Sequence, residues 1–162
     1  MLLDFSPDQH LLIVSKTRTL DEIKAYYDIG HRHFGENRVQ ELLLKSNELK
    51  ASCPEIKWHM IGHLQSNKVK DLFKVHHLES IHSVDSVHLL DELIKNEHRL
   101  NQRVGIFLQF NTSREEEKSG FESSSELDVA IARFKNREHL YLQGLMTMGA
   151  LRVDDQMKSA EA

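Results

Sequence analysis

The chain has 162 residues, of which 40% are hydrophobic and 28% are charged, a composition typical of an ordinary globular protein. Its formal net charge of -4 gives no broad positive surface for nucleic acid, and no apolar run approaches the roughly 20 residues needed to span a bilayer. The single cysteine, Cys53, excludes an internal disulfide, and the first residues lack the pattern of a secretion signal. We therefore expect one domain over residues 1–162, in a reducing cytoplasm, with neither nucleic acid nor a membrane as partner.

Apolar, β-branched runs alternate along the chain with stretches of helical period, which is the pattern of repeated βα units around a parallel sheet. Six runs predict strands: Leu11–Ser15, Arg32–Gly35, Lys57–Ile61, Leu78–Ser83, Val104–Asn111 and Tyr141–Met146. Such units either close into a (β/α) barrel or remain an open, doubly wound sheet. In both arrangements, ligands bind at the carboxyl ends of the strands.

Capping signals and apolar stripes predict five helices between these strands. Thr19 and Glu22 have the spacing of a capping box, and Gly30 can end the helix that follows. The second helix is expected from Arg38 to Leu49, and a shorter third helix from Asn67 to Phe73 with Ser66 as its N-cap. The fifth helix is expected after the serines at 123–125. The residues expected to face inward are Leu20, Ile23, Tyr27, Val39, Leu42, Leu43, Leu49, Val87, Leu90, Leu93, Ile94, Leu127, Ala130, Ile131 and Phe134.

Polar residues follow the predicted strands at the edge where a ligand would bind. Lys16 ends the first apolar run, and an amine at the end of a buried strand can lose its proton by desolvation and then condense with an aldehyde such as pyridoxal phosphate. The other polar groups at strand ends are Asn37, the segment from His59 to His63, Ser83 with Asp85, Asn111 with Thr112, and Thr147. Together they predict a pocket rim.

Two of these residues have simpler interpretations. Asn37 can cap the second helix, line the pocket, or do both. His59 and His63 are four residues apart, but His59 is expected in a strand and His63 in a turn, so the spacing does not place both imidazoles on one helix face. We therefore expect no metal site, and we expect Trp58 and Met60 to pack on the side opposite His59.

Several multi-residue segments occur in an order that closely resembles the pyridoxal phosphate homeostasis protein family, also called proline synthase co-transcribed proteins. This family is part of the alanine racemase N-terminal-domain-like group. The resemblance covers about residues 11–162. The segments are Val14-Ser15-Lys16-Thr17, Phe34-Gly35-Glu36-Asn37, Trp58-His59-Met60-Ile61-Gly62-His63-Leu64-Gln65-Ser66-Asn67-Lys68, His82-Ser83-Val84-Asp85-Ser86, Asn111-Thr112-Ser113, Glu116-Glu117-Lys118-Ser119-Gly120-Phe121 and Gly144-Leu145-Met146-Thr147-Met148.

The resemblance implies a fold-type-III barrel that binds pyridoxal 5'-phosphate, with Lys16 at the position of the lysine that holds the cofactor as a Schiff base. It further implies that Asn37, His59, Ser83 and Met146 border the cofactor. Members of the family look like carriers or buffers in vitamin B6 and amino-acid homeostasis, without an established catalytic reaction. A Schiff base alone does not racemise an amino acid, because a positioned acid and base are also needed. No residue here is assigned that role.

The chain departs from the family pattern at both ends. Only residues 1–10 precede the first predicted strand, where relatives have an extra helix, and Val153–Lys158 resembles the start of a sixth helix. The family's last two βα units, which supply its phosphate cradle and the arginine facing the pyridine nitrogen, are missing. Because a complete barrel typically needs about 250 residues, we expect an incomplete TIM-type (β/α) barrel of six βα units. Weak phosphate-dependent affinity and oligomerisation through exposed sheet edges would follow.

Two alternatives remain open. The first is a degenerate interaction protein or gene remnant that keeps the scaffold and binds no cofactor. The second is a pyridoxal phosphate-dependent amino-acid racemase or decarboxylase of the same fold group. Saturable aldehyde binding that depends on Lys16 distinguishes the main hypothesis from the first, and loss of the substrate α-proton into solvent is needed to support the second.

Overall fold

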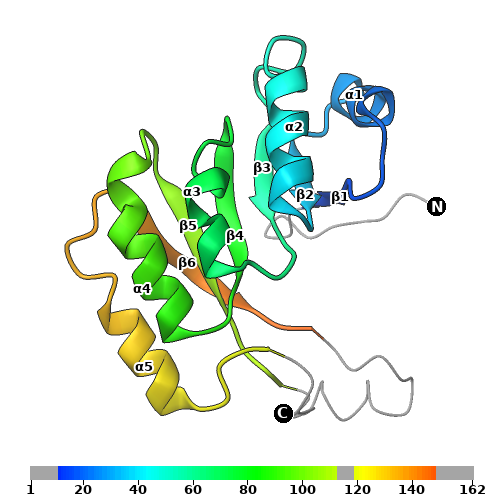
Figure 1. Cartoon of the computed structure of the whole chain (residues 1–162). Helices are drawn as coiled ribbons and strands as arrows, with labels where there is room; N and C mark the ends of the chain where they lie inside the picture. The colour runs from blue at the N-terminus through cyan, green and yellow to red at the C-terminus, as the bar shows by residue number, and fades with distance from the viewer. Residues whose placement is uncertain (1–10, 113–118, 149–162) are drawn as a thin grey trace, which may run out of the picture.

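A computed structural model describes residues 11–112 and 119–148, and within them six parallel strands form one sheet in chain order (Figure 1). The strands are β1 (Ile13–Val14), β2 (His33–Glu36), β3 (Lys57–Met60), β4 (Leu78–Val84), β5 (Val104–Gln109) and β6 (Leu140–Met146). Each strand is added beside the preceding one, which is the order of a (β/α) barrel. β1 and β6 are the two edges of the described sheet, so the barrel is partial there.

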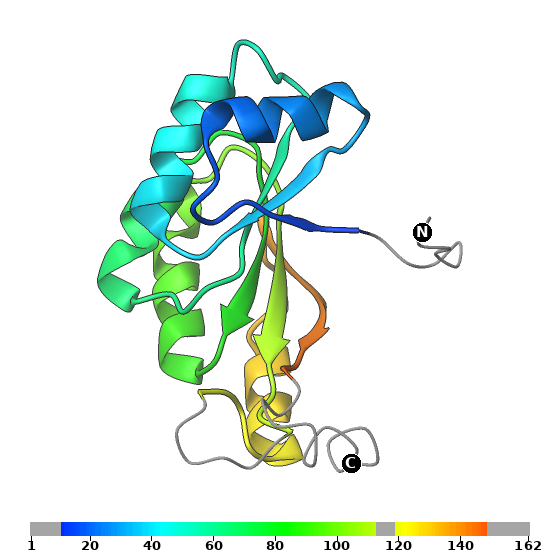
Figure 2. The same cartoon turned by 90° about the vertical axis from the view of Figure 1, so that its right-hand side faces the viewer.

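Helices connect the strands and pack beside one another in chain order, from the first to the last. They are α1 (Leu20–Asp28), α2 (Val39–Leu49), α3 (Val69–Leu72), α4 (Val87–Asn96) and α5 (Ser124–Ala132), with 3-10 turns η1 (Ser66–Lys68) and η2 (Glu97–Arg99). Figure 2 shows α2, α3 and α4 along the same side of the sheet. None of the helices described is long and apolar enough to cross a membrane.

The core lies between the sheet and these helices. Phe34, Trp58, Met60 and Ile106 are all fully buried there, at 0% exposure. Because strand side chains alternate between the two faces, His33 and Gly35 in β2 and His59 in β3 face the other, concave side of the sheet. The predicted packing role of Trp58 and Met60 is therefore confirmed.

The predicted strands are all present, with small shifts at their ends. The largest difference is β1, which spans only Ile13–Val14 and not Leu11–Ser15. As an edge strand it pairs with β2 alone, through Ile13 opposite Phe34 and Val14 opposite Gly35, so its ladder is short. Ser15 still donates its backbone N–H to the Gly35 carbonyl at 2.9 Å, which extends the pairing beyond the strand itself.

The capping box at α1 is confirmed. The Thr19 hydroxyl accepts from the Glu22 N–H at 3.2 Å, and the Thr19 N–H donates to Glu22 Oε2 at 2.8 Å. Gly30 has a φ of 107°, a left-handed conformation that favours glycine, so its predicted role in ending the helix is also confirmed. The serine cap region before α5 is confirmed by Ser123, whose hydroxyl accepts from the Glu126 N–H.

Two local predictions are wrong, those for Ser66 and Ile131, and one of the two roles left open for Asn37 is excluded. Ser66 caps no helix, because the segment begins as the 3-10 turn η1 with Gln65 at its N-cap position, and Lys68 N–H bonds to the Gln65 carbonyl instead. Asn37 does not cap α2, whose N-cap residue is Arg38 without a side-chain bond. Ile131 is 43% exposed, since α5 lies at the end of the helix layer and packs mainly against α4. The predicted helix at Val153–Lys158 lies outside the described residues.

Candidate functional site

Lys16 lies in a tight turn directly after β1. The turn is closed by a hydrogen bond of 3.0 Å from the Arg18 N–H to the Ser15 carbonyl, with Lys16 and Thr17 between them. Thr17 has a φ of 62°, which is an outlier for a β-branched residue. The Lys16 side chain is exposed. The prediction that a lysine follows the first strand is therefore correct, but the burial that would desolvate its amine is not seen, because Lys16 is exposed. The backbone that presents this amine is strained.

A buried polar group anchors this turn from the helix side of the sheet, and we call Ser15, Glu36 and Lys45 the ion-pair cluster. The Lys45 ammonium donates to Glu36 Oε1 at 2.6 Å and to the Ser15 carbonyl at 2.9 Å. The Ser15 hydroxyl donates to the same Glu36 oxygen at 2.8 Å. Exposure of the three residues is 1% for Ser15, 0% for Glu36 and 7% for Lys45. The cluster thus ties the ends of β1 and β2 to α2.

Asn37, Gly62 and Ser83 come together at the carboxyl ends of β2, β3 and β4. A Cβ atom added at Gly62 would collide with the backbone of Asn37, so these two strand ends approach closely only because residue 62 is glycine. The Ser83 hydroxyl donates to the Gly62 carbonyl at 2.6 Å, and Ser83 itself is buried. Two of the predicted site residues, Asn37 and Ser83, are therefore held next to the same glycine.

His59 belongs to a chain of imidazoles across the concave face, and we call His33, His59, Ser80 and His82 the histidine cluster. His33 Nδ1 and His59 Nε2 are 2.9 Å apart, and the other ring nitrogen of His59, Nδ1, lies 2.6 Å from Ser80 Oγ. Ser80 Oγ in turn lies 2.7 Å from His82 Nε2. The His82 ring stacks on Phe107, with ring centroids 4.3 Å apart. The cluster spans β2, β3 and β4.

Two of these imidazoles, those of His59 and His82, are uncharged at neutral pH. Burial lowers the pKa of His59 to about 3, and repulsion from His82, His33 and Lys57 adds to that effect. Burial alone lowers the pKa of His82 to about 4. A cavity of about 230 Å³ lies beside the rings. Within residues 11–112 and 119–148, no group of three or more His, Cys, Asp or Glu side chains is arranged to hold a metal ion.

Met146 is the predicted site residue farthest along the sheet. It ends β6, where it pairs with Gln109 of β5, and it is half-buried. Because β6 is the opposite edge of the described sheet from β1, the structure groups Asn37 and Ser83 around Gly62 and leaves Met146 at the other edge. Sequence reasoning missed Glu36 and Lys45 as the groups that bind Ser15, the residue before Lys16, and it missed His33 and His82 as neighbours of His59. The only signal for the histidines was one imidazole in each of three consecutive strands.

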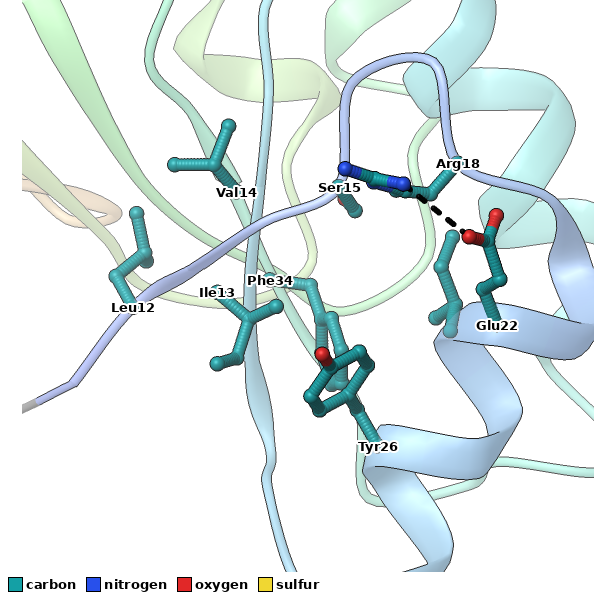
Figure 3. Close-up of a pocket in the computed structure, with 9 residues that line it drawn as sticks. Leu12, Ile13, Val14, Ser15, Arg18, Glu22, Tyr26 and Phe34 are labelled. Atoms are coloured by element: carbon teal, nitrogen blue, oxygen red, sulfur yellow. Dashed lines mark hydrogen bonds and ion pairs between the residues drawn. The ribbon is translucent and has the colours of Figure 1, made fainter. Parts of the chain in front are cut away.

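A second cavity, of about 320 Å³, lies on the helix side of β1 (Figure 3). Ile13, Phe34 and Tyr26 form its apolar wall, and the Arg18–Glu22 ion pair, at 3.3 Å, lies beside them. Lys16 does not line it, so this cavity is a groove between β1 and α1 and not the candidate site. β1 and β6 each pair with only one strand among those described, and association through these edges stays a prediction.

The parallel, barrel-ordered sheet agrees with the comparisons with known proteins. Residues 3–162 match the family model described as alanine racemase, N-terminal domain. The chain belongs to the alanine racemase N-terminal domain family. The family resemblance and the fold class predicted from the sequence are thereby confirmed.

Within this family, curated relatives carry the name pyridoxal phosphate homeostasis protein. The relative from Homo sapiens is 42% identical over 146 residues, which are 86% of this chain and 52% of the relative. The relative from Pasteurella multocida is 35% identical over 140 residues, which are 86% of this chain and 59% of the relative. The chain therefore spans somewhat more than half the length of the curated relatives it matches.

Solved structures show the same fold. PipY of Synechococcus elongatus PCC7942 without PLP is 33% identical, with a TM-score of 0.81 over 91% of this chain and 67% of PipY. PipY with PLP bound is 29% identical, with a TM-score of 0.77 over 97% of this chain and 76% of PipY. Alanine racemase from E. faecalis, at 16% identity, has a TM-score of 0.72 over 96% of this chain and 42% of that protein, and supports the fold alone.

Proposed function

We propose that this chain binds pyridoxal 5'-phosphate covalently through Lys16 and acts in intracellular vitamin B6 and amino-acid homeostasis. The observation that carries the proposal is the position of Lys16, an exposed amine in the anchored turn after the first strand. The name of the curated relatives and the PLP bound to PipY point to the same ligand. When bound, the cofactor supplies an aldehyde that a primary amine can attack.

The other predicted site residues have side chains that fit the aldehyde side of this ligand. Asn37 follows Glu36, which the ion-pair cluster fixes to the end of β1, and it can offer an amide to a polar ring substituent. Ser83 donates to Gly62 and keeps its oxygen lone pairs as acceptors. His59 is neutral, so its contribution is packing or a hydrogen bond and not an opposite charge. Met146 would add an apolar contact from β6.

The phosphate side of the ligand has no assigned partner among the residues described. We therefore propose that phosphorylated and unphosphorylated ligands bind with similar affinity. A phosphate group held by backbone N–H groups at a helix start would instead give a strong preference for the phosphorylated form. The preference between the two ligands thus reports directly on whether a phosphate site is present.

The proposal is for a carrier or buffer and not for a racemase or decarboxylase. Those reactions need an acid and a base beside the lysine. The described groups that adjoin Lys16 through Ser15 are Glu36 and Lys45, and both are buried on the helix side of the sheet, paired with each other. The proposed compartment is the cytoplasm, which is consistent with Cys53 being a buried free thiol.

The test is a visible-absorbance titration of the chain with pyridoxal phosphate and, separately, with unphosphorylated pyridoxal. We expect a saturable band in the wild type that disappears in Lys16→Ala, because Lys16 is the amine proposed to form the covalent link. The control Lys70→Ala removes an exposed lysine on α3 and should leave the band unchanged.

Absence of a saturable band, or a band that survives in Lys16→Ala, would contradict the proposal and favour the non-binding alternative. Exchange of the α-proton of an amino acid with solvent deuterium, dependent on Lys16, would contradict the non-catalytic part and favour a racemase or decarboxylase.

A further inference from the structure

The backbone that carries Lys16 is in a conformation that the local sequence disfavours. Thr17 has a φ of 62°, although a β-branched side chain crowds the backbone in the left-handed region. Conformations of this kind persist only where the surrounding structure holds them in place. The contacts that hold this turn therefore determine where the backbone places Lys16.

Both backbone groups of Ser15 are fixed. Its N–H donates to the Gly35 carbonyl at 2.9 Å, and its carbonyl accepts from the Arg18 N–H at 3.0 Å. The same carbonyl accepts a second hydrogen bond, of 2.9 Å, from the Lys45 ammonium. This second bond comes from a charged donor, which makes it stronger than a bond between neutral groups.

Lys45 is buried between the sheet and the helices, where an ammonium group needs a counter-charge. Glu36 supplies it through Oε1 at 2.6 Å, while Glu36 Oε2 is buried without a hydrogen-bond partner among the residues described. Apolar side chains of similar volume commonly stabilise such a position as well as an ion pair does. Stability alone therefore does not explain why the pair is charged. The better explanation is that the Lys45 ammonium binds the Ser15 carbonyl, directly before Lys16.

We propose that Lys45 and Glu36 are a positioning pair for Lys16, acting from the helix side of the sheet. Lys45 fixes the start of the turn, and Glu36 fixes Lys45. Because Glu36 directly precedes Asn37, the pair also sets the position of the second polar group at this edge. The inference rests on the proposed function, in which Lys16 is the residue that binds the aldehyde.

The test uses the double variant Glu36→Gln with Lys45→Met. Removing both charges together avoids leaving one of them buried and unpaired, so the fold is retained while the donor to the Ser15 carbonyl is lost. Two properties are measured: the hydrogen-exchange rate of the Arg18 amide, and the site of labelling when substoichiometric pyridoxal phosphate is trapped by borohydride and mapped to individual lysines. If the first double variant does not fold, Glu36→Met with Lys45→Met provides the same test.

In the wild type we expect trapping to concentrate at Lys16 and the Arg18 amide to be protected. In the double variant we expect Arg18 exchange to rise about tenfold, which corresponds to the loss of one hydrogen bond to a charged group. The share of label on Lys16 relative to exposed lysines should fall by about the same factor, because the amine is no longer held in one place.

The matched control is Glu97→Gln. The Glu97 carboxylate is also buried, and it accepts from the His139 and Leu140 N–H groups at 2.8 and 2.9 Å to hold the start of β6. This variant disturbs a buried polar anchor at the other edge of the sheet, so neither Arg18 exchange nor the share of label on Lys16 should change. If it raises Arg18 exchange and lowers the share of label on Lys16 as much as the double variant does, the effect is general destabilisation and the positioning proposal is wrong.

Unchanged Arg18 exchange in the folded double variant would overturn the proposal, as would unchanged labelling of Lys16. If the wild type itself is not labelled at Lys16, the proposed function fails. The exchange rate of Arg18, which needs no ligand, then decides by itself whether Lys45 and Glu36 hold the turn.

Discussion

The two faces of the sheet bury polar groups in opposite ways. On the helix side, the ion-pair cluster buries a lysine and a glutamate as a charged pair with their atoms 2.6 Å apart. On the concave side, the histidine cluster contains two uncharged imidazoles, with the pKa of His59 lowered to about 3 by burial and that of His82 lowered to about 4. The charged pair lets the Lys45 ammonium bind and fix the Ser15 carbonyl. Neutral imidazoles give a hydrogen-bonded array whose stability depends on pH.

Removing one partner of the ion pair is the strongest test of this difference between the two faces. Lys45→Met leaves the Glu36 carboxylate buried without a cation, and we expect the free energy of unfolding to fall by about 3–5 kcal/mol. Urea denaturation at neutral pH measures this loss. The control Lys24→Met removes an equally short ion pair, 2.7 Å from Asp28 on the exposed side of α1, and should cost less than about 0.5 kcal/mol. Equal losses in the two variants would show that burial of the Lys45 pair is energetically unimportant.

Acid should lower the free energy of unfolding through the two buried histidines of the concave side. Below pH 6.5 the unfolded chain protonates His59 and His82, whereas the folded chain keeps them neutral down to about pH 4 for His82 and about pH 3 for His59. The unfolded state therefore binds more protons, and stability falls as pH falls by about 1.4 kcal/mol per pH unit for each histidine. The ion pair of Lys57 with Glu79, at 3.3 Å, also lies beside this cluster.

The measurement is the free energy of unfolding between pH 6.5 and 5, above the range in which most carboxylates titrate. His59→Gln keeps a group that can hydrogen-bond to Ser80 and should lower the slope by about 1.4 kcal/mol per pH unit. If the wild type and His59→Gln show the same slope, the imidazole of His59 is not buried in its neutral form.

The smallest effect is expected from the hydroxyl of Ser15. It donates to Glu36 Oε1 and to the Gly35 carbonyl, but Lys45 continues to bind the same Glu36 oxygen when the hydroxyl is absent. Ser15→Ala should therefore lower the free energy of unfolding by about 1–2 kcal/mol, less than Lys45→Met. Ser124→Ala, at an exposed position in α5, should change it by less than about 0.5 kcal/mol. If Ser15→Ala lowers the free energy of unfolding as much as Lys45→Met does, the hydroxyl and not the ion pair provides most of the cluster's stability.

Local patterns in the sequence were sufficient for much of the fold. The capping box at Thr19 and the stripe of Leu20, Ile23 and Tyr27 predicted α1, because caps and helical periodicity involve residues only three or four positions apart. The same kind of reasoning was wrong at Ser66, where a 3-10 turn competes with an α-helical start and both fit the local sequence. Local rules do not decide between two geometries of similar energy.

The sequence by itself determined the parallel βα order and the position of Lys16 after the first strand, because alternating strand and helix patterns place strand ends at one edge of a sheet. Only the tertiary structure decided which groups hold the turn that carries that lysine. Lys45 is nine residues from Glu36 and thirty from the Ser15 carbonyl, yet it binds both. His33 and His82 reach His59 in the same way, from neighbouring strands. Such contacts depend on strand register and on how α2 packs, neither of which is encoded in a local pattern.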